Sequence, residues 1–538
     1  MKASVEIELR FLVPAAARVA LLAEIARRAT AVERRRLSAI YLDTGDRRLA
    51  RAGIGWRLRR EGRRWIQNLK ARGSGSLARF EHEVIRPAAT HDAAAHAGTV
   101  VGKQLIAILG KAGSDGMEVG VRFRTDVTRT SRRIRTRGAV VEVSFDEGRL
   151  LAADSSRRIR EVEFELVSGP ATAMIALAER WRKRFELILE PHSKAERGDR
   201  LAEGLPYSPV RRARNPSYPR DASAPVALGA VIDECLAQIS CNAVGIVDGS
   251  PASRVEHVHQ LRVGIRRLRS ALRTYAGWTP PPPPALIADL RALFAVLGQS
   301  RDSDVLDSGV VAELAKVGAP RLKGGVGEPG PDPVDVIRAA TTQRLLLAWI
   351  AWRAALSEGP GERTATTAGD GDAGRVAPGT GSAATPAADT PKAGTQASVT
   401  EEPSHEPIVF HEVLQRRLRK WHRRIAADSK VFDELDEASL HSLRKRIKRQ
   451  RYAVEFFAPV LRASTVDRYV KPLAAIQDRM GELNDLFVAR ERFQAHVAVD
   501  PAAWFALGWI AARISEVRAL AKPELAALAR ADPPKAGS

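Results

Sequence analysis

Every second residue is charged in several strand-like segments of the first 204 residues. Residues 5–11 (VEIELRF) alternate apolar and charged side chains, and residues 161–166 (EVEFEL) repeat the pattern with three glutamates. A period of two places successive side chains on opposite faces of a β-strand. Charged faces usually point to water, but carboxylates that follow one another on one face repel each other unless a cation holds them. The set therefore favours a closed antiparallel barrel with a polar lumen.

Basic residues gather on other predicted strands of the same region. Arg57 and Arg59 lie on one face of such a strand, and Lys70 shares a face of the next one with Asn68. Clustered Glu side chains suit a hard divalent cation such as Mg²⁺ or Mn²⁺, whereas Arg and Lys suit phosphate oxygens. The lumen is therefore predicted to bind a divalent cation together with a phosphate chain.

The composition changes twice along the chain. Residues 1–204 alternate strands with short helices, residues 205–222 are rich in Pro, Arg and Ser as in a linker, and residues 223–530 have a helical period. Within the helical region, residues 358–407 have almost no large apolar side chains and are predicted to be a disordered insertion. Residues 531–538 form a tail. We expect a multi-domain α+β protein, with an antiparallel β-barrel (a tunnel) and flanking helices followed by an all-α domain.

An ordered series of motifs runs through the N-terminal region. It begins with EIELR at 6–10, continues with YLDT at 41–44 and GWRLR at 55–59, and ends with HSKA at 192–195. This order resembles the CYTH domain family, the triphosphate tunnel metalloenzymes. The first basic residue of that family is usually Lys, whereas this chain has Arg10, which keeps the charge but presents a planar fork in place of a compact ammonium.

The resemblance implies a metal-dependent hydrolase of inorganic triphosphate or short phosphate chains. Its cofactor would be Mg²⁺ or Mn²⁺, which would polarise the terminal phosphoryl group. The residues that it implies as metal ligands are Glu6, Glu8, Glu161, Glu163 and Glu165. The residues that it implies as catalytic are Glu6, Glu8, Arg10, Lys70 and Glu163. The residues that it implies for binding the phosphate chain are Arg57, Arg59, Arg79, Arg129 and Lys194.

The helical region contains a duplicated basic helix. VHQLRVGIRRLRSAL at 258–272 matches LHSLRKRIKRQRYAV at 440–454. The spacing places one His and three basic residues of each copy along one stripe of a helix. These residues are His259, Arg262, Arg266 and Arg269 in the first copy and His441, Arg444, Lys448 and Arg451 in the second. Because like charges on one stripe repel, their repetition favours an anion-binding groove over a solvated face. The duplication predicts two pseudo-symmetric helical bundles.

This duplicated HxLR…R pattern resembles the CHAD domain, a helical family that commonly follows CYTH domains. The resemblance spans about residues 223–530, interrupted by the predicted insertion. It implies that the helical domain binds inorganic polyphosphate, with polyphosphate granules as a candidate partner.

The net charge of +22 also points to a polyanionic partner. Aromatic residues make up only 5% of the chain, which is few for stacking on bases, so nucleic acid is a disfavoured partner. Cys235 and Cys241 are expected to be buried thiols of a reducing compartment. The most apolar stretch, 345–352, is too short to span a bilayer, and the N-terminus has no apolar signal-peptide core. We expect a cytoplasmic protein without a membrane partner.

Two other functions stay open at this point. A class IV adenylyl cyclase is built on the same tunnel, but it needs a pocket for the base of ATP, and none is identifiable in the sequence. A non-catalytic polyphosphate-granule adaptor would bind phosphate chains without hydrolysing them. The carboxylates at both ends of the N-terminal region count against such an adaptor, whereas Arg10 leaves it open.

Overall fold

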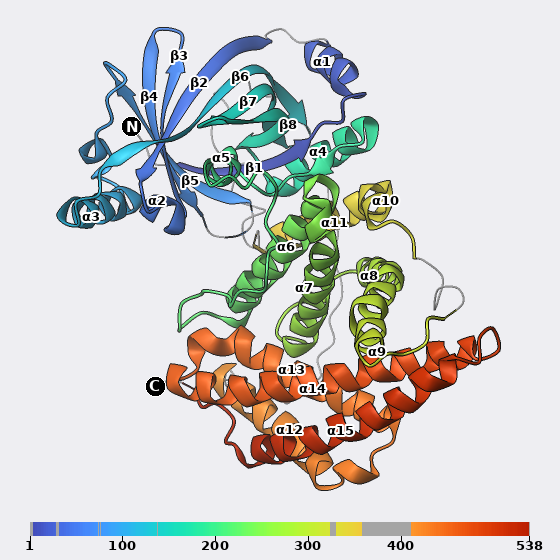
Figure 1. Ribbon diagram of the computed structural model, residues 1–538. Helices are drawn as coiled ribbons and strands as arrows, with labels where there is room; N and C mark the ends of the chain where they lie inside the picture. The colour runs from blue at the N-terminus through green and yellow to red at the C-terminus, as the bar shows by residue number, and fades with distance from the viewer. Residues whose placement is uncertain are drawn as a thin grey trace, which may run out of the picture.

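The chain folds into a β-barrel followed by two layers of helices (Figure 1). The computed structural model describes residues 4–27, 32–73, 75, 77–136, 138–322, 330–357 and 410–536, of which 4, 300–308, 357, 410 and 411 are described by their backbone alone. The predicted disordered insertion, 358–407, lies outside the described residues.

Eight of the described strands close into an antiparallel barrel. Their order around the ring is β5-β4-β3-β2-β6-β7-β8-β1, and β1 closes the ring by pairing through residues 4–7 with β5 and through residues 8–12 with β8. The short strand β9 pairs with the end of β1. The strands are β1 (Ser4–Leu12), β2 (Glu33–Thr44), β3 (Ile54–Glu61), β4 (Arg64–Arg72), β5 (Ala78–Arg86), β6 (Val119–Thr136), β7 (Ala139–Ala152), β8 (Ser155–Ser168) and β9 (Ile188–Leu189). The predicted antiparallel barrel is confirmed.

Helices cover the outside of the barrel and bury the apolar face of each strand. Phe11 of β1 packs edge to face on Phe164 of β8, which packs in the same way on Trp181 of α4. Two smaller apolar cores lie beneath α5 and beneath α2 and α3. These helices are α1 (Arg18–Ala26), α2 (Arg48–Arg51), α3 (Val100–Ser114), α4 (Ala171–Phe185) and α5 (Lys194–Ala202). Because side chains alternate along a strand, burial of the apolar faces outside leaves the charged faces to line the lumen.

The helical domain consists of two bundles with the same order of neighbours. In the first, α6 and α8 each contact α7 and α11; in the second, α12 and α14 each contact α13 and α15. The two copies of the duplicated helix, α7 and α13, contact each other and join the bundles. The first bundle comprises α6 (Ala224–Asp248), α7 (Arg254–Thr274), α8 (Pro284–Val305) and α11 (Ala340–Ser357), with the short helices α9 (Ala312–Lys316) and α10 (Pro333–Arg338). The second comprises α12 (Phe410–Lys430), α13 (Glu437–Phe457), α14 (Ala463–His496) and α15 (Ala503–Arg530). The two predicted bundles are confirmed.

The barrel and the first bundle share one apolar core. Leu189 of β9 belongs to the same buried cluster as Leu346 and Ile350 of α11. The segment between the domains, predicted to be a linker over 205–222, has no helix or strand but is fastened to the helical domain. Asn242 Nδ2 donates to the Arg211 carbonyl at 2.8 Å. The two domains therefore meet through a packed interface and an anchored connection.

Among the described helices, α6 alone is long and apolar enough to cross a membrane by length and composition. Its most apolar window has a mean hydropathy of 1.4, and 72% of that window is buried inside the molecule. The sequence prediction placed the most apolar stretch at 345–352 instead, and that segment lies in α11. Cys235 and Cys241 both lie on α6, where they are free and buried, as predicted.

Candidate functional site

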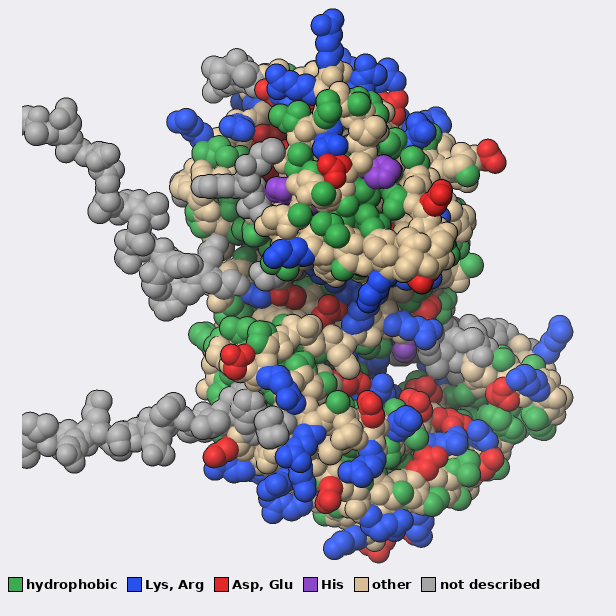
Figure 2. Space-filling view, turned by 90° about the vertical axis from the view of Figure 1, so that its left-hand side faces the viewer, with side chains coloured by type: hydrophobic (Ala, Val, Ile, Leu, Met, Phe, Trp, Pro, Cys, Tyr) green, Lys and Arg blue, Asp and Glu red, His purple; other side chains and the backbone are tan. Residues whose placement is uncertain are grey.

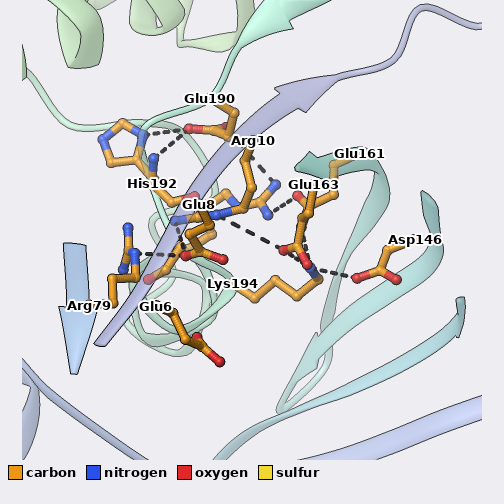
Figure 3. A network of polar contacts seen from close by, with 12 residues as sticks. Glu6, Glu8, Arg10, Arg79, Asp146, Glu161, Glu163, Glu190, His192 and Lys194 are labelled. Atoms are coloured by element: carbon orange, nitrogen blue, oxygen red, sulfur yellow. Dashed lines mark hydrogen bonds and ion pairs between the residues drawn. The ribbon is translucent and has the colours of Figure 1, made fainter. Parts of the chain in front are cut away.

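Three carboxylates surround one ammonium group in the barrel lumen. Asp146 of β7 and Glu161 and Glu163 of β8 bring carboxylate oxygens to within 4.8 Å of one another. Lys194 Nζ lies 2.7 Å from Asp146 Oδ2 and 2.8 Å from Glu163 Oε1, and it also pairs with Glu161. Figure 3 shows Lys194 extending between the strands toward Asp146 and Glu163. Lys194 therefore contacts all three carboxylates, which would otherwise repel one another.

The position of Lys194 follows from the way helix α5 begins. Ser193 caps the helix: its Oγ accepts a hydrogen bond from Glu196 N at 3.1 Å, and Glu196 Oε2 accepts one from Ser193 N at 2.8 Å. This reciprocal capping box fixes the first turn of α5. One turn later, a Cβ at Gly198 would come within 2.1 Å of the Phe123 ring, so the helix lies close against the barrel there. Together these contacts direct Lys194, the first residue of α5, into the lumen.

Two arginines flank the same carboxylates. Arg129 of β6 donates two hydrogen bonds of 2.7 Å to Asp146 and one of 2.5 Å to Glu163. Arg10 Nε lies 4.0 Å from Glu163 Oε1. Burial raises the pKa of Glu163, but Lys194, Arg129 and Arg10 outweigh burial and hold this pKa well below its usual range. Glu163 is therefore ionised at neutral pH and stays available as an anionic ligand.

The two glutamates at the start of β1 pair with separate cations. Glu8 Oε1 lies 2.7 Å from Arg79 Nε and 3.2 Å from Arg10 Nη2. Glu6 Oε2 accepts a hydrogen bond of 2.7 Å from Lys70 Nζ. Burial raises the pKa of Glu8, but Arg10 and other nearby cations bring it below the usual value. The alternation predicted for β1 therefore places Glu6, Glu8 and Arg10 in ion pairs inside the barrel.

Glu165 differs from the other predicted metal ligands. It lies opposite Glu8 in the register of β1 and β8. Within the described part of the chain, no Lys or Arg nitrogen lies within ion-pair distance of its carboxylate. Burial and the charge of Glu6 raise the pKa of Glu165 to about 7. Within the described residues, Glu165 therefore lacks the Lys or Arg partner that the other predicted metal ligands have.

Across the ring from β7 and β8, the wall formed by β3, β4 and β5 carries further charged groups. Arg57 donates at 3.3 Å both to Asn68 Oδ1 and to the Tyr41 hydroxyl. Arg59 Nη2 lies 2.6 Å from Glu61 Oε1 and 3.2 Å from Glu83 Oε1. Burial and the neighbouring charge of Arg57 lower the pKa of Arg59. Cations crowded in this way are stabilised by an anion that enters among them.

The donor set of the lumen fits a hard divalent cation. Carboxylate oxygens are the ligands that Mg²⁺ and Mn²⁺ prefer, and three of them already converge on the cationic Lys194. A divalent cation at this cluster would compete with Lys194 for the same oxygens. Asp146 was not among the predicted ligands, although its inward position on β7 followed from the same period of two. Glu161 also forms an ion pair with Arg197 of α5, so it helps to hold this helix against the barrel.

The helical domain contains a cavity of about 1100 Å³ between α7, α13 and α14. Arg266 of α7 and Arg444 and Lys448 of α13 line this cavity. Burial and the charges of Arg444 and Arg266 lower the pKa of Lys448 to about 7, so the three cations are close enough to repel. Acidic side chains of α14, including Asp478 and Glu482, line another part of it. Figure 2 shows a hollow in the helical part of the molecule with both basic and acidic side chains around it.

The residues of the predicted basic stripe lie in different surroundings. Arg262 and Arg269 lie over the Phe294 ring of α8, with guanidinium carbons 4.6 and 5.8 Å from the ring centre. His441 lies at a smaller cavity of about 450 Å³, with its Nδ1 3.1 Å from Asn484 Oδ1. The stripe residues that line the large cavity are His259, Arg266, Arg444, Lys448 and Arg451.

Two family matches cover most of the chain. The CYTH domain family matches residues 4–198, and the CHAD domain family matches residues 230–494. Among curated proteins, an inorganic triphosphatase of Haemophilus influenzae is 28% identical over 165 residues, which are 30% of this chain and 45% of that relative. The chain therefore spans under half the length of this curated relative.

Solved structures resemble the two halves separately. The CHAD domain from the plant Ricinus communis is 26% identical with a TM-score of 0.41, covering 61% of this chain and 99% of that chain. A Hippeastrum protein, named as an adenylyl cyclase with a dominant triphosphatase activity, is 17% identical with a TM-score of 0.27. That match covers 38% of this chain and 96% of the Hippeastrum chain.

Proposed function

This chain is a CYTH domain followed by a CHAD domain, and we propose that its barrel hydrolyses inorganic triphosphate or related short phosphate chains with the help of a divalent cation. The observation that carries the proposal is that carboxylates suited to a divalent cation and Arg and Lys side chains suited to phosphate oxygens meet in one lumen. Asp146 and Glu163 lie on one side of the ring, and Arg57, Arg59 and Lys70 lie on strands across from them. The Haemophilus influenzae relative, named an inorganic triphosphatase, supports this class of substrate.

Each part of the lumen has a separate task in this proposal. Bound Mg²⁺ or Mn²⁺ supplies Lewis-acid polarisation of the terminal phosphoryl group. The candidate ligands are Glu6, Glu8, Asp146, Glu161, Glu163 and Glu165. Arg10, Arg79 and Lys194 donate N–H groups to phosphate oxygens and neutralise their charge. In the structure these cations pair with carboxylates. When substrate and metal bind, the cations would pair with phosphate oxygens instead, and the carboxylates would pair with the metal.

Phosphate release tests the proposal directly. The full chain is incubated with tripolyphosphate, ATP or thiamine triphosphate, each with Mg²⁺, with Mn²⁺ and with EDTA. We expect release from tripolyphosphate that depends on the metal and stops with EDTA. Metal-independent release would contradict the assigned role of the carboxylates, and no release under any condition would favour a non-catalytic adaptor.

The ATP reaction separates the proposal from the rival enzyme. A class IV adenylyl cyclase would form cyclic AMP and pyrophosphate, whereas a triphosphatase that accepts ATP would form ADP and phosphate. We expect no cyclic AMP, because the described lumen is lined by ion pairs, which suit the phosphates of ATP more than its base. Cyclic AMP as the main product would overturn the assignment.

Lys70→Ala should weaken substrate binding more than it slows the bound substrate. Lys70 Nζ holds Glu6 at 2.7 Å and Glu81 at 3.0 Å and is placed to exchange them for phosphate oxygens. We expect the KM for tripolyphosphate to rise about tenfold and kcat to change less than about threefold, since a positioning charge acts in both ground and transition states. Arg59→Ala should change KM and kcat in the same way.

Lys103→Ala, which removes the same charge from the exposed face of α3, is the control. An unchanged KM in both lumen variants would exclude these residues from the substrate path.

A second role is favoured by the cavity of the helical domain. We propose that Arg266, Arg444 and Lys448 bind inorganic polyphosphate, because a chain with a charge on every unit relieves the repulsion among these cations. The other cavity-lining candidates are His259 and Arg451, while Arg262, Arg269 and His441 contact other groups. Attachment to polyphosphate granules and a cytoplasmic location stay predictions.

A further inference from the structure

The segment from Ile188 to Lys194 contacts the lumen on one side and the helical domain on the other. At its start, Glu190 N donates to the Arg10 carbonyl at 2.9 Å. In the middle, the His192 carbonyl accepts a hydrogen bond from the Arg10 guanidinium. At its end, Lys194 enters the carboxylate cluster. Two cations of the lumen are therefore placed by one short segment, as Figure 3 shows.

Helix α11 of the helical domain holds the start of this segment. Leu189 N donates a hydrogen bond of 3.0 Å to Gln343 Oε1, and Gln343 Nε2 donates one of 2.9 Å to the Ile337 carbonyl. Only 1% of the Gln343 surface is exposed. Buried backbone groups need such partners, because an unmade hydrogen bond away from water is costly. Gln343 thus fixes β9 with respect to the first bundle.

Helix α6 holds the middle of the segment. The His192 ring and main chain both contact Glu190: Nδ1 lies 2.9 Å and the backbone N 2.8 Å from Glu190 Oε1. Burial lowers the pKa of this imidazole, but Cys241 of α6 and Glu190 outweigh burial and raise it. His192 and Cys241 are both buried. The orientation of His192, and with it the carbonyl that receives Arg10, is therefore supported from the helical domain.

We propose that the helical domain is a positioning element of the tunnel: Gln343 holds the segment that carries Lys194 and accepts Arg10. The contacts of Gln343 are with Leu189 and Ile337, so it acts on the lumen through that segment. The inference rests on the proposed triphosphatase function. It predicts that defects at this interface lower turnover even where polyphosphate binding by the helical domain is unchanged.

Gln343→Met in the full chain tests the inference. Methionine keeps the length of the side chain but cannot accept from Leu189 N or donate to the Ile337 carbonyl. Gln450→Met is the matched control, because Gln450 is also fully buried in the helical domain and donates to the Leu418 carbonyl and the Tyr469 hydroxyl, away from the tunnel. We expect kcat/KM for tripolyphosphate to fall about tenfold in the first variant and less than about twofold in the second, since small displacements of positioning groups lower rates strongly.

The melting temperature separates positioning from general destabilisation. Both variants leave buried polar groups unpaired, so both should lower Tm, and activity is compared well below either Tm. Equal kcat/KM in the two variants would overturn the inference. If the wild type binds tripolyphosphate without hydrolysing it, the proposed function fails, and the calorimetric affinities of the two variants then decide the positioning role.

Cys241 provides an independent variant in case Gln343→Met does not fold. Cys241→Ala removes the thiol from His192, whereas Cys241→Ser keeps a hydrogen-bonding group of similar size. We expect a loss of about threefold or more in kcat/KM for the alanine variant and recovery in the serine variant. Cys235→Ala removes a buried thiol from the same helix without touching the tunnel segment and should leave kcat/KM unchanged. Equal values for Cys241→Ala and Cys235→Ala would exclude a role for Cys241.

Discussion

Glu163→Gln is expected to lower kcat for tripolyphosphate by about 10²–10³-fold while the fold stays intact. The Glu163 carboxylate contacts Arg129 at 2.5 Å and Lys194 at 2.8 Å, and it lies in the cluster that fits a metal. The amide keeps the shape of the side chain but removes its charge, so both the cation site and the alignment of two basic side chains are lost. Steady-state phosphate release at limiting Mg²⁺ measures the effect, and circular dichroism checks the fold.

Glu147→Gln is the matched control for this variant. Glu147 is the same residue type on the neighbouring strand β7, and it pairs at 2.7 Å with Arg18 of α1 instead of with a lumen cation. Its loss should leave kcat within about twofold of the wild type, because a partly exposed ion pair away from the carboxylate cluster contributes little. Near-normal turnover of Glu163→Gln at limiting Mg²⁺ would show that this carboxylate is not part of the metal site.

Replacing Arg266, Arg444 and Lys448 together by alanine is expected to weaken binding of long-chain polyphosphate to the full protein by about 10²-fold at moderate salt. These cations come from both copies of the duplicated helix and meet at one cavity. Loss of three positive charges also reduces counterion release, so the salt dependence of the affinity should become shallower. Calorimetry at several salt concentrations measures both effects.

A second triple variant controls for net charge. Arg416, Arg419 and Arg423 are exposed on α12, and within the described part of the chain none of them has an ion-pair partner. Their replacement by alanine removes the same charge from the outer surface of the second bundle. We expect at most about a fivefold loss of affinity, from long-range attraction alone. Equal losses of affinity in the two triple variants would mean that the net charge of the protein decides polyphosphate binding and that the cavity is not the binding site.

For the lumen, the sequence predicted which residues share one face of a strand. The period of two in β1 predicted that Glu6, Glu8 and Arg10 share one face, because alternation is a property of the strand itself. The partners of these residues were not predictable in detail. Arg79 pairs with Glu8 at 2.7 Å, which depends on the closure of β1 against β5. Asp146 was not predicted as a candidate ligand, since only the pairing of β7 with β8 brings it beside Glu161.

For the helical domain, the sequence predicted the two bundles but not which basic side chains meet. The repeat of residues 258–272 at 440–454 predicted two equivalent bundles, and the neighbours of α7 and α13 bear this out. The helical spacing also grouped Arg262 with Arg266 on one stripe. The structure separates them, because the Phe294 ring of α8 lies 4.6 Å from the Arg262 guanidinium, while Arg266 lines the cavity.

By itself, the sequence determined the two domains, the strands with a charged face, the duplicated basic helix and most of the candidate phosphate-binding and metal-binding residues. The charged strands and the basic helix follow from periodicity, which depends on local chain geometry alone. The candidate residues follow from the resemblance of the motifs to two families. The carboxylate cluster around Lys194, the division of the basic stripe and the support of the tunnel by Gln343 required the tertiary structure. Leu189 and Gln343 lie 154 positions apart, and no local pattern encodes the docking of two domains that brings them to 3.0 Å.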